Sequence, residues 1–178
     1  MRYVAFLRAV NVGGRGIVKM GELAARLTQL GLKDVKTVIA SGNVMFTAPS
    51  GSTDALGRKI GADLEAWLGY PVAVMVRTLA ELEALVASNP FKGVERAPDA
   101  RLYVAFLWKE PAAPPRLPLV AKRDGLELFR LAGREGFMVS ARLDSGFFGM
   151  PNLTIEKALG VPCTTRNWNT VLRMVKSE

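Results

Sequence analysis

The sequence contains no histidine, and Cys163 is the single cysteine among its 178 residues. Without histidine there can be no Ser-His or Cys-His nucleophile pair and no imidazole-bound metal. One thiol can build neither an intramolecular disulfide nor a structural zinc site, so we predict no metal centre and expect Cys163 to be a buried, inert thiol. Any catalysis would have to use carboxylates, Lys, Tyr, the lone thiol or bound Mg²⁺.

Long hydrophobic runs are missing as well. The apolar runs reach about ten residues, whereas a helix that crosses a bilayer needs roughly 20. The first apolar run is followed by no small-residue cleavage site, and it is more typical of a first strand than of a signal peptide. Since 49% of the residues are apolar, which is ample for a buried core, we expect a soluble cytoplasmic protein without membrane contact.

Negative charge is scarce: the sequence has 24 Lys and Arg but only 16 Asp and Glu, which gives a net charge of +8 and a pI near 10.0. An excess of positive charge favours anionic partners such as nucleotides, phosphorylated metabolites or nucleic acid. The excess is spread evenly, with 12 basic and 8 acidic side chains in residues 1–98 and the same numbers in residues 99–178. Solubility charge and a basic binding face therefore both fit the sequence.

The opening Tyr-Val-Ala-Phe-Leu segment, residues 3–7, recurs as residues 103–107. The apolar spacing, turn residues and helix-ending glycines after the first copy predict an alternation of strands and helices. The predicted elements are a strand at 3–10, a helix at 19–30, strands at 35–40 and 44–47, a helix at 53–68 and a strand at 72–76. This order is that of the ferredoxin-like split βαβ fold.

The second half follows the same order less completely. A capping box at Thr78 and Glu81 opens a connecting helix, and a linker at 92–99 precedes the second half. The predicted elements are strands at 102–108, 126–131 and 137–142, a helix at 152–159 capped by Asn152, and a helix at 166–176 where a last strand would be expected. We therefore predict an α+β fold of two ferredoxin-like subdomains, 1–98 and 99–178, related by an imperfect internal repeat. The second subdomain is degraded and ends in a helix.

A glycine-rich loop at residues 8–16 leaves the first strand. Gly13 and Gly14 would let the backbone approach a ligand closely, and Arg8 could hold a phosphate or carboxylate beside Asn11. The spacing is neither a P-loop nor a dinucleotide fingerprint, so no cofactor is predicted. A plain loop is the alternative interpretation of this segment. Asn43, in the Ser-Gly-Asn hairpin turn, is a second candidate, and there the alternative is that a tight turn simply favours these residues.

The third candidate segment is residues 164–170, in which Thr165 can cap the last helix and Trp168 begins its apolar face. Helix propensity does not explain Arg166, Asn167 and Asn169. Arg166 would stand at the positive end of the helix dipole, which is unfavourable unless an anion is near. We therefore interpret this segment as functional.

Five motifs together resemble the bacterial Domain of Unknown Function 1697 family. They are residues 7–14 (Leu-Arg-Ala-Val-Asn-Val-Gly-Gly), 41–44 (Ser-Gly-Asn-Val), 89–91 (Asn-Pro-Phe), 156–157 (Glu-Lys) and 165–171 (Thr-Arg-Asn-Trp-Asn-Thr-Val). The resemblance covers essentially the whole chain. It implies an α+β protein and brings no established activity, cofactor or catalytic residue. Ala9 stands where the family usually has Gly, and Ala40 where it usually has Gln, which weakens any role for the side chain at position 40.

Two functions fit these observations, and neither identifies a reaction or an oligomeric state. The first is binding, with or without catalysis, of a small anionic ligand in a cleft between the halves. The residues assigned to it are Arg8, Asn11, Gly13, Gly14, Asn43, Arg166, Asn167, Trp168 and Asn169. The second is binding of single-stranded RNA on a sheet that exposes aromatics such as Tyr3 and Phe46. A protein-interaction module, recognised by a large apolar patch, is a third possibility.

Overall fold

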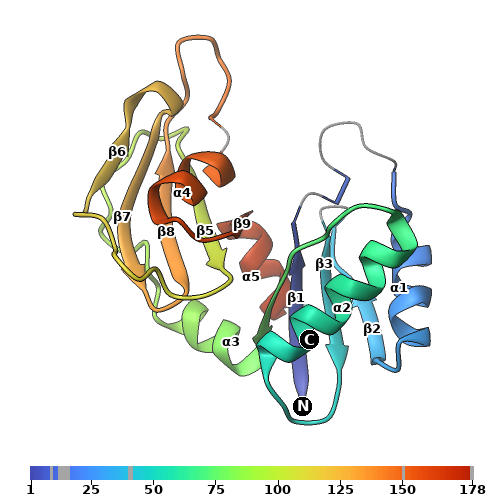
Figure 1. Ribbon diagram of the computed structural model, residues 1–178. Coiled ribbons are helices and arrows are strands. Elements are labelled where there is room, and N and C mark those ends of the chain that lie inside the picture. The colour runs from blue at the N-terminus through green and yellow to red at the C-terminus, as the bar shows by residue number, and fades with distance from the viewer. Residues whose placement is uncertain (9, 12–16, 40–41, 150, 177–178) are drawn as a thin grey trace. The chain divides into compact units, whose positions relative to one another are not determined.

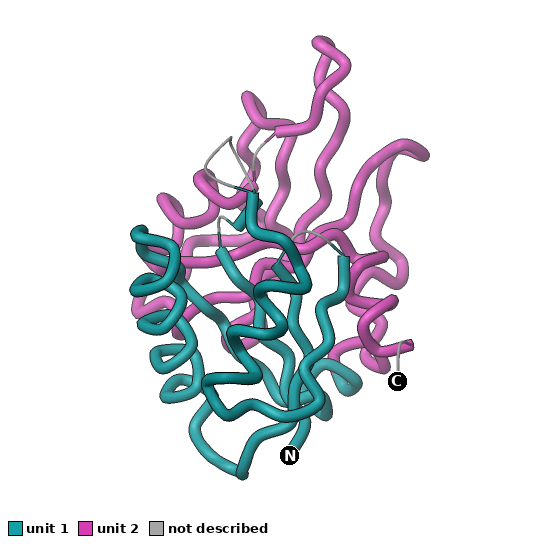
Figure 2. The backbone as a smooth tube through the Cα atoms, turned by 90° about the vertical axis from the view of Figure 1, so that its right-hand side faces the viewer, with its two compact units in different colours: residues 1–84 teal, residues 85–178 magenta. Residues whose placement is uncertain are grey.

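The computed structural model describes residues 1–8, 10–11, 17–39, 42–149 and 151–176, and these ranges form two antiparallel sheets and five α-helices (Figure 1). The α+β character expected from the sequence is confirmed. The chain divides into two compact units, Met1–Ala84 and Leu85–Glu178 (Figure 2). This boundary lies inside α3, Leu79–Ala87, whereas the predicted division into 1–98 and 99–178 stays a prediction. None of the helices in the described ranges is both long and apolar enough to cross a membrane.

The first unit contains four strands and two helices before α3. They are β1 (Arg2–Leu7), α1 (Met20–Gln29), β2 (Lys33–Thr37), β3 (Asn43–Thr47), α2 (Thr53–Leu68) and β4 (Val74–Thr78). The strands lie in the order β2-β3-β1-β4, and every neighbouring pair is antiparallel. The bounds of α2 are those predicted, because its end signals are local: the Ser52 hydroxyl accepts from the Ala55 N–H, and Gly69 ends the helix with a φ of +76°.

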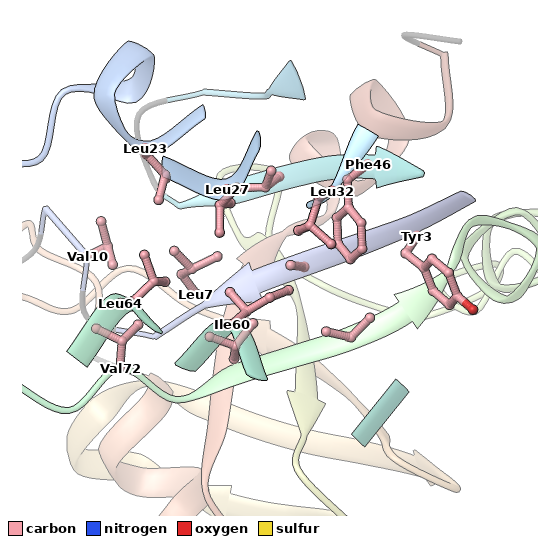
Figure 3. Packing of buried hydrophobic residues seen from close by; sticks show 14 of the residues in the cluster. Tyr3, Leu7, Val10, Leu23, Leu27, Leu32, Phe46, Ile60, Leu64 and Val72 are labelled. Atoms are coloured by element: carbon pink, nitrogen blue, oxygen red, sulfur yellow. The ribbon is translucent and has the colours of Figure 1, made fainter. Parts of the chain in front are cut away.

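The core of the first unit lies between its sheet and the two helices (Figure 3). Side chains of a strand alternate between its faces, so Tyr3 and Leu7 of β1 point into the same core as Leu27 of α1 and Ile60 of α2. The Tyr3 ring stacks on Phe46 with 5.6 Å between the ring centres, and Tyr3 and Phe46 are 0% and 2% exposed. The expectation that these two rings form an exposed RNA-binding platform is therefore wrong.

The second unit contains a five-stranded sheet and two helices after α3. Its elements are β5 (Arg101–Leu107), β6 (Leu119–Ala121), a 3-10 turn η1 (Lys122–Asp124), β7 (Leu126–Ala132), β8 (Glu135–Ser140), α4 (Pro151–Leu159), β9 (Cys163–Asn167) and α5 (Trp168–Lys176). The strand order is β6-β7-β8-β5-β9, and all pairs are antiparallel. α4 covers one face of this sheet, where Ile155 and Leu159 pack against Ala105, Leu128 and Met138.

The end of the chain differs from the prediction, because a last strand is present. Residues 163–167 form β9, which pairs with β5 from Leu107 opposite Cys163 to Tyr103 opposite Asn167. The helix predicted to start at 166 starts at Trp168, and Asn167 caps it by accepting from the Asn169 N–H at 2.9 Å. The helical spacing begins at Trp168 and does not include residues 166 and 167, whose strand conformation depends on pairing with β5.

The prediction that Asn152 caps α4 is wrong. The helix begins at Pro151, a favoured first helical residue because its missing N–H would have no partner there. Asn152 lies within the first turn, and its Oδ1 accepts the Thr165 N–H at 2.8 Å. This side chain therefore joins α4 to β9. The predicted end of the helix is found, since Gly160 follows α4 with a φ of +63°.

Candidate functional site

Three of the predicted site residues, Arg8, Asn11 and Asn43, come together at one end of the first unit's sheet. Arg8 follows β1 directly, and its backbone N–H donates to the Ala73 carbonyl at 2.9 Å. The neighbouring Leu7 N–H donates to the Gly42 carbonyl at 2.8 Å, and Gly42 precedes Asn43 at the start of β3. A Cβ at Gly42 would lie 3.0 Å from the Leu7 Cβ, so the two loops are in contact. The predicted residues Gly13 and Gly14 lie outside the described residues.

The two asparagines in this cluster bind the backbone of their own loops. Asn11, at a φ of +57°, donates from Nδ2 to the Val18 carbonyl at 2.9 Å and accepts the Val18 N–H at 2.7 Å. Asn43 is fully buried, and its Nδ2 donates to the Val38 carbonyl at 3.0 Å. Both side chains thus have a structural role, since each satisfies backbone groups at a turn.

In the second unit, the strand conformation of β9 sends Arg166 and Asn167 to opposite faces of the sheet. Arg166 is 8% exposed, and its Nη1 donates to the Thr164 hydroxyl at 2.7 Å and to the Thr165 carbonyl at 2.9 Å. Burial lowers its pKa to about 10, so it stays charged at neutral pH. Because Arg166 lies in a strand, the expected conflict with a helix dipole does not arise.

The remaining predicted residues of this segment have structural surroundings. Trp168 is buried, and its ring centre lies 5.1 Å from that of Phe91. Asn169 is exposed in the first turn of α5. Cys163 is fully buried in β9, as expected, and its backbone N–H donates to the Glu156 Oε1 at 2.8 Å. The Glu156 carboxylate is therefore engaged in holding the start of β9.

A site that the sequence reasoning missed lies on the surface of the second unit. It is a pocket of about 550 Å³ lined by Asp99, Arg101, Arg142, Gly146, Phe147 and Phe148. Arg101 begins β5 and Asp99 lies two residues before it, whereas the other four come from the loop that connects β8 to α4 (Figure 1). Below, these six residues are called the arginine pocket.

The loop of the arginine pocket is built by a tight turn. The Gly146 N–H donates to the Leu143 carbonyl at 2.8 Å, and the Leu143 N–H donates to the Phe147 carbonyl at 2.8 Å. Gly146 has a φ of +82°, which completes a three-residue hairpin loop of the kind that needs glycine at its left-handed position. The turn therefore fixes the backbone from which Phe147 and Phe148 project.

The base of the same loop is held by the 3-10 turn η1. The Ala141 N–H donates to the Gly125 carbonyl at 2.7 Å, and the Thr154 hydroxyl donates to the Asp124 carboxylate at 2.6 Å. A Cβ at Gly149 would overlap the Asp124 carbonyl oxygen, so only glycine allows this close approach. Both ends of the loop are thus tied to one short segment.

The charged groups of the arginine pocket are held in place by the loop. The Arg101 guanidinium carbon lies 3.8 Å from the centre of the Phe148 ring, within cation–π distance. Arg142 donates from Nε to the Gly146 carbonyl at 2.9 Å. Guanidinium groups bind phosphate and carboxylate oxygens through paired N–H groups, so two of them at one pocket suit an anion.

The same residues offer little for catalysis or for metal binding. Asp99 is the carboxylate of the arginine pocket, and its described lining residues include no hydroxyl, thiol or amine nucleophile. Within the part of the chain that the structure describes, no group of three or more Cys, Asp and Glu could hold a metal ion.

The sequence contains signs of the arginine pocket, but they lie in two segments that are far apart in the chain. Residues 143–148 read Leu-Asp-Ser-Gly-Phe-Phe, a turn sequence followed by two adjacent aromatic residues in an otherwise polar loop. Arg101 precedes the repeated strand segment, and nothing in the local pattern joins it to residues 142–148.

Comparison with known proteins gives two findings. A family model described as "Protein of unknown function (DUF1697)" matches residues 1–137. A solved structure, that of the conserved bacterial protein SP0830 from Streptococcus pneumoniae, is similar with a TM-score of 0.63 and 23% sequence identity, covering 98% of this chain and 97% of the other. At this identity the likeness concerns the fold alone. No curated protein matches the sequence.

Proposed function

The chain belongs to the DUF1697 family, whose proteins are described as of unknown function, and we propose that its second unit binds a small anionic ligand in the arginine pocket. The ligand carries a phosphate or carboxylate group, which Arg101 and Arg142 hold. The observation that carries this proposal is the Arg101 guanidinium 3.8 Å from the Phe148 ring, on the same pocket as Arg142. This chemistry agrees with the net charge of +8.

Preorganisation of the two guanidinium groups supports this function. Ordering a long, flexible side chain on binding costs about 0.5–1.5 kcal/mol. Stacking on Phe148 and the hydrogen bond from Arg142 to Gly146 restrict both side chains before a ligand arrives. A volume of about 550 Å³ also lies within the range of roughly 300–1,000 Å³ that is usual for small-molecule sites.

The residues predicted from the sequence stay a separate prediction. As ligand-binding groups, Arg8, Asn11, Asn43, Arg166, Asn167 and Asn169 have no support beyond their sequence pattern. For Asn11 and Asn43, the backbone hydrogen bonds offer a sufficient structural reason.

We also infer that the two units are ferredoxin-like repeats. In support, β1 pairs with β3 and β4, and β5 pairs with β8 and β9, so the strand that carries the repeated segment is central in both sheets. In the second unit, β6 and η1 occupy the connection that α1 occupies in the first. The arginine pocket belongs to the unit whose first connection has lost its helix.

Binding of single-stranded RNA is the second candidate. Phe147 is 74% exposed beside the two guanidinium groups, and an exposed ring can stack a base whose backbone phosphate meets an arginine. This function predicts affinity for oligonucleotides that falls steeply as salt concentration rises.

Titration calorimetry with inorganic phosphate and pyrophosphate at low ionic strength tests the proposal. We expect saturable binding of at least one anion, weakened about tenfold or more by Arg101→Gln and by Arg142→Gln, because each removes a charge-assisted hydrogen bond. Arg123→Gln is the matched control, since Arg123 is exposed on η1 and is not among the described residues that line the arginine pocket. Equal weakening by all three variants, or no binding of either anion to the unaltered protein, contradicts the proposal.

A further inference from the structure

We propose that the ligand of the arginine pocket is a nucleoside monophosphate, an inference that rests on the proposed function. The pocket combines two features that an anion alone would not require. One is an exposed aromatic ring on a fixed turn, and the other is a carboxylate beside the two arginines. Together with the guanidinium groups, these features match a flat ring, a sugar and one phosphate.

Phe147 provides the face for the ring. Its side chain is 74% exposed, although the backbone that carries it is fixed by the hydrogen bond between its carbonyl and the Leu143 N–H at 2.8 Å. Covering an exposed apolar ring with another flat ring removes apolar surface from water, which is favourable. Stacking of a base on an aromatic side chain contributes about 1–3 kcal/mol to binding. Phe148 has a different role, because Arg101 already lies over its ring.

Arg101 and Arg142 provide the site for the phosphate. A guanidinium that stacks on a ring still has N–H groups in its own plane with which to grip an oxyanion. Two guanidinium groups match the charge of one phosphate monoester, which carries about −1.5 to −2 at neutral pH. Asp99 lines the same pocket and its negative charge disfavours further phosphates, so the pocket favours a monophosphate over a triphosphate.

Asp99 provides an acceptor for neutral donors. It is exposed, two residues before β5, and lines the same pocket as the two arginines. A carboxylate accepts hydrogen bonds from hydroxyl and amino groups, and a nucleoside presents both on its sugar and base. Asp99 therefore distinguishes a nucleotide from inorganic phosphate and from a dicarboxylate.

The experiment compares three kinds of probe by titration calorimetry. These are the four ribonucleoside 5′-monophosphates, ribose 5-phosphate, which lacks the base, and the parent nucleosides, which lack the phosphate. We expect at least one monophosphate to bind about tenfold more tightly than ribose 5-phosphate, because it adds the stacking interaction. The corresponding nucleoside should bind more weakly than its monophosphate.

Variants of exposed residues assign the gain to Phe147. Phe147→Ala should remove the advantage of the monophosphate and leave the affinity for ribose 5-phosphate within about twofold. The control is Leu153→Ala, an equally apolar substitution at a residue that is 63% exposed on α4, and it should change neither affinity. Both residues are largely exposed, so neither substitution removes core packing.

The outcomes separate this inference from the proposed function. If ribose 5-phosphate and all four monophosphates bind equally, the nucleotide inference is wrong and anion binding stands. If none of them binds and inorganic anions do not bind either, both are wrong. A single-stranded RNA oligonucleotide that binds more than tenfold more tightly than every monophosphate assigns the pocket to RNA and overturns the nucleotide inference.

Discussion

Asn11 and Val18 exchange two hydrogen bonds, one from the Val18 N–H to Oδ1 at 2.7 Å and one from Nδ2 to the Val18 carbonyl at 2.9 Å. The amide side chain thus occupies the place that a paired backbone segment would occupy in a sheet. Asn43 makes one bond of this kind, from its Nδ2 to the Val38 carbonyl at 3.0 Å. An amide offers a donor and an acceptor side by side, so Asn11 is explained by the pair of hydrogen bonds with which it holds Val18.

Asn11→Asp tests this explanation. Aspartate tolerates the left-handed conformation nearly as well and keeps the acceptor for the Val18 N–H, but it replaces the donor by a second oxygen facing the Val18 carbonyl. We expect the free energy of unfolding to fall by about 1–3 kcal/mol in urea titrations. Asn169→Asp, at an exposed residue of the first turn of α5, should change it by less than about 0.5 kcal/mol. Equal effects of the two substitutions would contradict the explanation.

The hydroxyl of Thr164 is a second side chain whose removal should be costly. It accepts a hydrogen bond from the buried Arg166 at 2.7 Å, and Thr164 itself is 1% exposed. Thr164→Val keeps shape and strand propensity but deprives a buried charge of an acceptor, so we expect a loss of about 1.5–3 kcal/mol in the free energy of unfolding.

Thr165→Val is the matched control, because residue 165 faces the opposite side of β9 and its hydrogen bonds to Asn152 and Arg166 use its backbone N–H and carbonyl, which valine keeps. It should cost less than about 0.5 kcal/mol. If both substitutions cost the same in urea titrations, the hydrogen bond to Arg166 contributes nothing measurable to stability.

Two glycines should respond in opposite directions to alanine. Gly149→Ala places a Cβ against the Asp124 carbonyl oxygen, and we expect the required backbone shift to cost about 1–3 kcal/mol of stability. Gly21→Ala lies within α1 with no atom within 4 Å of the new Cβ, and it should stabilise by about 0.5–1 kcal/mol because alanine restricts the unfolded chain. Thermal unfolding of both variants checks the signs; a rise in Tm for Gly149→Ala would mean that the loop is not packed on η1 as described.

The elements that the sequence predicted well have local causes. The bounds of α2 follow from Ser52 and Gly69 at its ends, and the predicted capping box is found, with the Thr78 N–H donating to Glu81 and the Glu81 N–H donating to the Thr78 hydroxyl. Such signals involve residues within one or two turns of each other. They can be read without knowing what packs on the helix.

The elements that were missed depend on residues distant in the chain. β9 forms because the edge of β5 is available for pairing, and Arg166 and Asn167 would not otherwise favour a strand. The arginine pocket joins residues 99–101 to residues 142–148, which meet only once β5 and β8 have paired with Arg101 opposite Ser140. The register of this pairing places the loop beside the start of β5, and a short stretch of sequence cannot predict the register between two strands that are distant in the chain.

The contact between Arg101 and Phe148 makes a prediction that distinguishes charge from geometry at the arginine pocket. Arg101→Lys keeps the positive charge but loses the planar group that stacks on Phe148 and binds oxyanions in pairs. Phe148→Leu keeps the arginine and removes the ring under it. We expect both variants to weaken phosphate binding by roughly three- to tenfold in calorimetry, because an exposed cation–π contact is worth about 0.5–1 kcal/mol and paired hydrogen bonds add to it. If Arg101→Lys binds phosphate as tightly as the unaltered protein, the pocket attracts anions through charge alone and the stacked geometry has no role in binding.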